Sequence, residues 1–187
     1  KIVLHNGTYT VYSDLVTMTA EYVILTGTPA AISTIQFSPL LDRSNAQLLQ
    51  RMPMGTSMKY FLIYAEGPWW RTMNPPMSGA AEATQMPTHL QFEEGVYACQ
   101  DHAPYDDMSV GAMMCWMEGE VNIRFLGTLT VEERKRHVLE YLAASFNDTR
   151  VSNPGPARIM EFNWADQEYI RGAYTGYFPP GVQSDPM

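Results

Sequence analysis

The strongest constraint on the fold is a short apolar segment, residues 57–65, whose composition is typical of a β-strand. Side chains of a strand alternate between its two faces, so Lys59, Phe61 and Ile63 would share one face. The opposite face would carry Met58, Tyr60, Leu62 and Tyr64. Both faces are apolar apart from Lys59, so a lysine at this position loses hydration unless it is paired or hydrated.

Lys59 is the only charged residue in this segment, and it has two interpretations. It can lie near the end of the strand and extend its ammonium group to water while its methylene groups cover apolar surface. Alternatively, it is a lysine that holds a water molecule in a buried active site. The segment by itself leaves both interpretations open.

The remaining pattern combines further strands with one clear helix, Thr130–Phe146. Thr130 and Glu133 form a capping box at its start, and apolar residues at helical spacing follow. Tyr22–Leu25 is nearly all apolar, which predicts a strand buried on both faces. Further predicted strands are Thr88–Phe92, Val96–Cys99, Val110–Met117 and Arg158–Phe162. We therefore expect an α+β fold in which helices flank a mixed sheet, with residues 1–187 as a single domain.

Charge and composition exclude several functions. The net charge is −8 and the chain has only three lysines, which argues against a protein that binds nucleic acid by neutralising phosphates. The apolar runs are too short for a transmembrane segment. No two glycines stand two residues apart and no Gly-Lys pair occurs, so the sequence lacks dinucleotide and P-loop motifs. No metal site is indicated, and an enzyme built on this chain would need a cofactor held elsewhere.

The signals for the cellular compartment are weak. Cys99 and Cys115 are the only cysteines and could form one disulfide, but two cysteines do not indicate a disulfide-rich framework. The triplets Asn6-Gly7-Thr8 and Asn147-Asp148-Thr149 match the acceptor pattern for N-linked glycans, yet such triplets often arise by chance. The localisation stays unknown at this point.

The segment Tyr169–Gly181 is irregular and rich in aromatic residues and glycine. Gly172 and Gly176 permit unusual backbone dihedrals or close approach. Such a segment can hold tyrosine rings against a flat ligand, or it can be a loop that packs on the core.

Four blocks of the chain are distinctive: Tyr22–Pro29, Gln50–Lys59 with Trp69, Leu129–Arg134, and Trp164 with Gly172–Gly181. Together they resemble the flavin-containing monoamine oxidases and their amine and L-amino-acid oxidase relatives. They occur in family order and span nearly the whole chain, and the last is the most specific.

The resemblance implies an incomplete substrate-binding domain of the flavin amine oxidase fold. The Rossmann-type FAD-binding domain of the family has no counterpart here, and Lys1–Leu4 is typical of the middle of a strand. We therefore expect a fragment of a longer flavoprotein. Its parent would oxidise an amine to an imine or aldehyde and release hydrogen peroxide, whereas the isolated chain would be inactive.

The resemblance also assigns roles to individual residues. Lys59 matches the family's active-site lysine, which holds a water near flavin N5, and Tyr174 matches one of two aromatic residues that enclose the substrate amine. Trp164 matches a tryptophan near the flavin, and Trp116 falls near an aromatic residue of the substrate cavity. Ala173 stands where animal monoamine oxidases carry a flavin-linked cysteine, so FAD would be bound non-covalently.

Two other functions remain open from the sequence. An L-amino-acid oxidase would need a cation for the substrate carboxylate, with Arg71 and Arg171 as candidates. The second of these functions is a non-catalytic binding or assembly module derived from the fold. The expected partners are an amine substrate and oxygen in the parent enzyme. The isolated chain would contact the missing FAD domain or self-associate.

Overall fold

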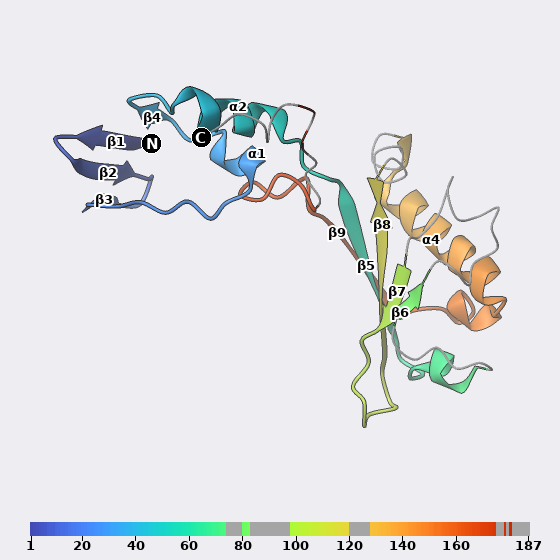
Figure 1. Cartoon of the computed structure of the whole chain (residues 1–187). Coiled ribbons are helices and arrows are strands. Elements are labelled where there is room, and N and C mark those ends of the chain that lie inside the picture. Colours follow the sequence, from blue (N-terminus) through green and yellow to red (C-terminus); the bar gives the residue numbers. More distant parts are fainter. Residues whose placement is uncertain (74–79, 83–97, 120–127, 175–177, 179, 181–187) are drawn as a thin grey trace. The chain divides into compact units, whose positions relative to one another are not determined.

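The fold is described from a computed structural model, which covers residues 1–73, 80–82, 98–119, 128–174, 178 and 180. These residues group into two compact units (Figure 1). The first contains residues 1–55 and the chain from Trp164 onward, and the second contains Thr56–Asn163. The assignment of the whole chain to one domain stays a prediction.

The first unit is built on a small mixed sheet and two helices. Its strands lie in the order β3-β2-β1-β4, with β1 and β4 parallel and the other pairs antiparallel. The helix α1 begins after Thr28, whose side chain accepts a hydrogen bond from the Ala31 amide, and α2 begins after Asp42. The elements are β1 (Ile2–His5), β2 (Thr8–Tyr12), β3 (Thr17–Ala20), α1 (Pro29–Ile32), β4 (Phe37–Ser38) and α2 (Arg43–Arg51).

The second unit is a five-stranded antiparallel sheet in the order β6-β7-β8-β5-β9, with one long helix. The central strand β5 pairs with both β8 and β9 along most of its length. The strands are β5 (Ser57–Tyr64), β6 (Ala80–Glu82), β7 (Ala98–Asp101), β8 (Gly111–Glu118) and β9 (Arg158–Asn163). The helices are α4 (Val131–Phe146) and the short 3₁₀ turns η1 (Trp69–Thr72) and η3 (Thr149–Val151).

The alternation predicted for residues 57–65 is confirmed in β5. Met58, Tyr60 and Leu62 are fully buried, whereas the side chains of Lys59 and Phe61 are half-buried. The buried face packs with the helix α4 and with the neighbouring strands into one core. One face of β5 therefore lies in the core of the unit, and its other face belongs to the more open side of the sheet.

The predicted helix is also confirmed, with Thr130 as its N-cap and the reciprocal capping-box bonds to Glu133. Its buried face does not follow the apolar pattern alone. Val131 is 44% exposed, whereas Arg134 and Tyr141 are buried together with Val138 and Leu142. Arg134 is buried because it has a carboxylate partner on β9, which a hydrophobic pattern does not reveal.

The strand predicted at Tyr22–Leu25 is wrong for this structure. Residues 22–26 form no strand, and the side chains of Tyr22 and Ile24 are 83% and 87% exposed. A strand needs the backbone groups of a neighbour, and no described residue pairs with this segment. The strand predicted at Thr88–Phe92 lies outside the described residues, and Val96–Cys99 overlaps β7 only at its end.

Three side chains join the helix to the sheet in a part-buried polar network. The Arg134 guanidinium donates to both carboxylate oxygens of Glu161, at 2.9 and 2.6 Å. The Tyr60 hydroxyl donates to Glu161 Oε2 at 2.9 Å, and burial followed by the Glu161 charge raises the pKa of that phenol. Arg134 also donates to the Leu129 carbonyl at 2.7 Å, so the network ties α4 to β5 and β9.

We expect Arg134→Met to destabilise the protein by roughly 3 kcal/mol, because it leaves the Glu161 carboxylate enclosed and unpaired. Urea unfolding followed by circular dichroism measures the free-energy change. The double variant Arg134→Met with Glu161→Leu should recover most of the loss, since it removes both charges together. A single variant as stable as the parent would show that the pair does not hold the helix to the sheet.

Candidate active site

Lys59 lies on the more open face of the five-stranded sheet, between two aromatic neighbours on adjacent strands. Its register partner on β8 is Trp116 and its register partner on β9 is Phe162. Lys59 Nζ lies 5.6 Å from the centroid of the Trp116 ring, within the range of a cation–π interaction. Such a contact stabilises an ammonium group beside an aromatic ring.

Apolar residues follow Lys59 along this face, with Phe61 and Ile63 on β5 and Met114 and Ala112 opposite them on β8. Charged residues lie at both ends of this stretch, because Glu118 is the register partner of Ser57 and Arg158 is that of Ile63. The Lys59 side chain is half-buried. A positive charge on an apolar aromatic surface can stabilise negative charge that develops nearby, because the weakly polar surroundings screen it less than water does.

Sequence reasoning identifies Lys59 and Trp116 but misses Phe162. Phe162 is 39% exposed and belongs to the last strand of the unit, more than one hundred residues from Lys59. Its strand is recognisable in the sequence, yet nothing there shows that this strand pairs with β5. The strand order β8-β5-β9 brings the three side chains together.

The other predicted site residues lie in the first unit. Ala173 is 8% exposed and exchanges two backbone hydrogen bonds with Gly55, at 3.0 and 2.7 Å. Trp164 is half-buried, and its carbonyl accepts a hydrogen bond from the Gly172 amide at 3.3 Å. Tyr174 follows directly and is 62% exposed. Trp164, Ala173 and Tyr174 thus share one segment of the first unit, while Lys59 and Trp116 belong to the second.

Gly172 is required in this segment by its backbone geometry. Its φ is +146°, and a Cβ atom at this position would lie 2.4 Å from Cβ of Met54. The close approach lets the chain beside Ala173 pair with Gly55. The Thr28 hydroxyl donates to the Ile170 carbonyl and gives the segment a second anchor. The residues of this segment beyond Tyr174 lie largely outside the described part of the chain.

The two arginines that could bind a substrate carboxylate differ in the hydrogen bonds that they already make within the protein. The Arg71 guanidinium donates to the Asp101 carboxylate, and also to the carbonyls of Ala103 and Pro104 at 2.8 and 2.9 Å. Its donors therefore hold the loop after β7 in place. Arg171 is exposed, has a φ of +56°, and donates from Nε to the Glu168 carbonyl at 3.1 Å. Of the two, Arg171 is the better candidate for binding an anion.

We expect Asp101→Asn to lower stability at neutral pH, with a difference that disappears in acid. Burial disfavours the Asp101 carboxylate, but hydrogen bonds from Arg71 and the Ala103 amide outweigh it and hold the pKa below 3.8. A lowered folded-state pKa stabilises the protein above the unfolded value, and this gain is lost as pH falls through the folded value. Urea midpoints of parent and variant at several pH values test this; a gap that persists in acid contradicts it.

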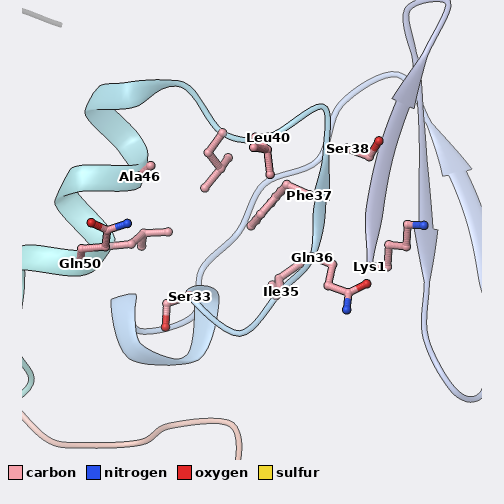
Figure 2. A pocket seen from close by; sticks show the side chains of 11 residues that line it. Lys1, Ser33, Ile35, Gln36, Phe37, Ser38, Leu40, Ala46 and Gln50 are labelled. Atoms are coloured by element: carbon pink, nitrogen blue, oxygen red, sulfur yellow. The ribbon is translucent and has the colours of Figure 1, made fainter.

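A cavity of about 650 Å³ lies in the first unit, apart from the residues discussed above (Figure 2). Its wall combines apolar side chains of the segment around β4 with others from α2. The lining includes Ile35, Phe37, Leu41, Ala46 and Leu49, with Gln36 and Gln50 among the polar residues. None of the predicted site residues contributes to it.

Neither a metal cluster nor a membrane helix is found in the described part of the chain. Within it, no group of three or more His, Cys, Asp or Glu side chains is placed to hold a metal ion. No helix there is long and apolar enough to span a membrane.

Comparison with known proteins identifies the family of the chain. The sequence model of the family of flavin-containing amine oxidoreductases matches residues 1–187. The flavin-containing amine oxidase of Danio rerio is 34% identical over 165 residues, and flavin-containing amine oxidase B of Bos taurus is 32% identical. The chain therefore belongs to the flavin-containing amine oxidoreductase family. Each alignment covers 88% of this chain and 29% of the relative, so the chain spans less than a third of their length.

Solved structures agree with this assignment. Cyclohexylamine oxidase from Brevibacterium oxydans matches with a TM-score of 0.74 at 26% identity. Wild-type putrescine oxidase bound to putrescine matches with a TM-score of 0.75, also at 26% identity. Both comparisons cover 97% of this chain and 37% of the other. The predicted α+β fold of the flavin amine oxidases, incomplete in this chain, is thereby confirmed.

Proposed function

We propose that this chain is the substrate-binding part of an FAD-dependent amine oxidase, which converts an amine to an imine or aldehyde and releases hydrogen peroxide. The observation that carries the proposal is the position of Lys59, which contacts Trp116 on a mostly apolar face of the sheet. Family membership supplies the reaction class. The isolated chain would be inactive, because most of the cofactor contacts would come from residues outside it.

The residues around Ala173 fit a flavin that is bound without a covalent link. Ala173 is buried and held by Gly55 through the backbone, and its methyl group has no sulfur with which to form a thioether. Trp164 and Tyr174 in the same segment would contact the ring system or the substrate beside it. When bound, the flavin would accept a hydride from the amine carbon and pass electrons to oxygen.

The chain's own side chains would prepare the substrate and the oxygen. The Tyr174 ring would form one wall of an apolar slot, and loss of hydration in such a slot favours the neutral amine, which is the form that can lose hydride. Trp116 would form part of the substrate cavity. The Lys59 ammonium, or a water that it holds, would stabilise the negative charge that oxygen gains during its reduction.

Oxidation of an L-amino acid is the second candidate function. Arg171 favours it, because this guanidinium is exposed two residues from Ala173. Arg71 does not, since its donors bind Asp101 and two carbonyls. A non-catalytic module is the third candidate. The first unit has exposed apolar side chains, such as Leu15 and Ile24. They support a contact with the FAD-binding domain of the family, or self-association, whichever of the three functions holds.

We expect the isolated chain not to retain FAD tightly, because it has no glycine pair of the dinucleotide-binding type. Absorbance in the flavin region, recorded after purification and again after incubation with excess FAD and gel filtration, measures retention. Stoichiometric flavin in the protein peak after gel filtration would contradict the expectation.

In the complete flavin-loaded enzyme, Lys59→Met should slow reoxidation of the flavin by oxygen by at least about tenfold and affect its reduction by amine less. The replacement keeps the length and apolar packing of the side chain, so stability should change little. Stopped-flow absorbance measures the two half-reactions separately. Lys135→Met is the matched control, because it removes a lysine that pairs with Glu132 on the surface of α4.

The same experiment can reject the role of Lys59. If Lys59 only extends to water at the edge of an apolar face, neither half-reaction should change. Reoxidation within about twofold of the parent corresponds to well under 1 kcal/mol of barrier and would rule out the active-site role.

A further inference from the structure

The two cysteines of the chain are joined across the sheet of the second unit. Cys99 on β7 and Cys115 on β8 are directly opposite each other in the register, with their Cα atoms 4.0 Å apart, and they form a disulfide. Both side chains are fully buried in the core of the unit. The sequence leaves the pairing open, whereas the strand register brings these two thiols together.

A disulfide between core residues indicates the compartment in which the chain folds. Its formation removes two protons and two electrons from the thiols, and the electrons pass by thiol–disulfide exchange to the oxidised dithiol of a folding catalyst. Such oxidants are maintained in secretory compartments, whereas cytosolic reductants keep thiols reduced. The burial of both sulfur atoms favours formation of the bond before or during assembly of β7 and β8.

The first glycan acceptor triplet lies at the tip of a hairpin. Asn6 and Gly7 connect β1 to β2, with positive φ values of 48° and 79°, as expected for an Asn-Gly hairpin turn. Asn6, Gly7 and Thr8 are all exposed. Both the amide that would carry a glycan and the hydroxyl that the transferase must recognise are thus on an accessible turn.

The second triplet lies at an exposed helix end. Asn147 is the C-cap of α4, with a φ of 49°, and Thr149 begins the turn η3. Both residues are exposed, and Asp148 between them is half-buried and bound to Arg150. Asn147 therefore also stands on a turn at the surface, in the other compact unit of the chain.

We propose that this chain matures in an oxidising, glycosylating secretory compartment and carries N-linked glycans on Asn6 and Asn147. In each transfer the asparagine Nδ2 attacks the anomeric carbon of a lipid-diphosphate-linked oligosaccharide. The C–O bond to the diphosphate breaks, the lipid diphosphate leaves, and Nδ2 loses one proton. The proposal does not depend on the proposed function, because the disulfide and the two turns are independent of the reaction catalysed.

The test uses the protein purified from the cells that naturally make it. Alkylation with iodoacetamide before and after reduction, followed by mass spectrometry, reports whether Cys99 and Cys115 are oxidised. Treatment with peptide N-glycosidase in ¹⁸O-water converts each glycosylated asparagine to a labelled aspartate. We expect alkylation of both cysteines only after reduction, and a labelled residue at positions 6 and 147.

Matched variants expressed in the same cells separate glycan acceptance from local folding. Thr8→Ala and Thr149→Ala each remove one acceptor triplet and leave the asparagine and its turn in place. Each variant should therefore carry one glycan fewer, seen as a smaller shift in electrophoretic mobility on treatment with peptide N-glycosidase. Thr8→Ser and Thr149→Ser keep the hydroxyl and should keep both glycans. Alkylation of the cysteines without reduction, or unlabelled asparagine at both positions, would overturn the proposal.

Discussion

The structure of the second unit depends on β5, a strand that is paired on both edges and covered on one face. Its backbone groups are satisfied by β8 on one side and β9 on the other, so the strand cannot slip without breaking two ladders. A shift by one residue would turn Lys59 toward the core and Met58, Tyr60 and Leu62 away from it. The ammonium group would lose hydration and the apolar side chains would become exposed, so the register is strongly specified.

The same alternation that builds the core also creates the candidate site. Residues facing α4 form the apolar core, and the polar atoms within it include the Tyr60 hydroxyl, which donates to Glu161, and the Tyr64 hydroxyl, which donates to the Val151 carbonyl. The opposite face holds Lys59 beside the Trp116 ring. The contact depends on strand pairing, because Lys59 and Trp116 are register partners on neighbouring strands. The site is therefore positioned by sheet pairing rather than by a loop, which favours a fixed geometry.

Two polar clusters secure the connections around this sheet. The Arg134–Glu161 pair joins the helix to the edge strand, and Arg71 with Asp101 holds the loop that leads into β8. In both, an arginine provides several donors at once and leaves no charge of the pair unmatched. The donors of Arg71 are thus engaged within the protein, whereas Arg171 is exposed.

Much of this could be predicted from the sequence. Strand alternation over residues 57–65, the capping box at Thr130 and the strands at Val110–Met117 and Arg158–Phe162 each rest on local rules of backbone geometry, and these elements form as predicted. The tertiary structure alone decided which strands are neighbours. The pairing of β5 with β9 puts Phe162 beside Lys59, and the register of β7 with β8 joins Cys99 to Cys115. It also decided against a strand at Tyr22–Leu25, because a strand exists only where another backbone meets its hydrogen-bonding groups, and no local sequence pattern records that partner.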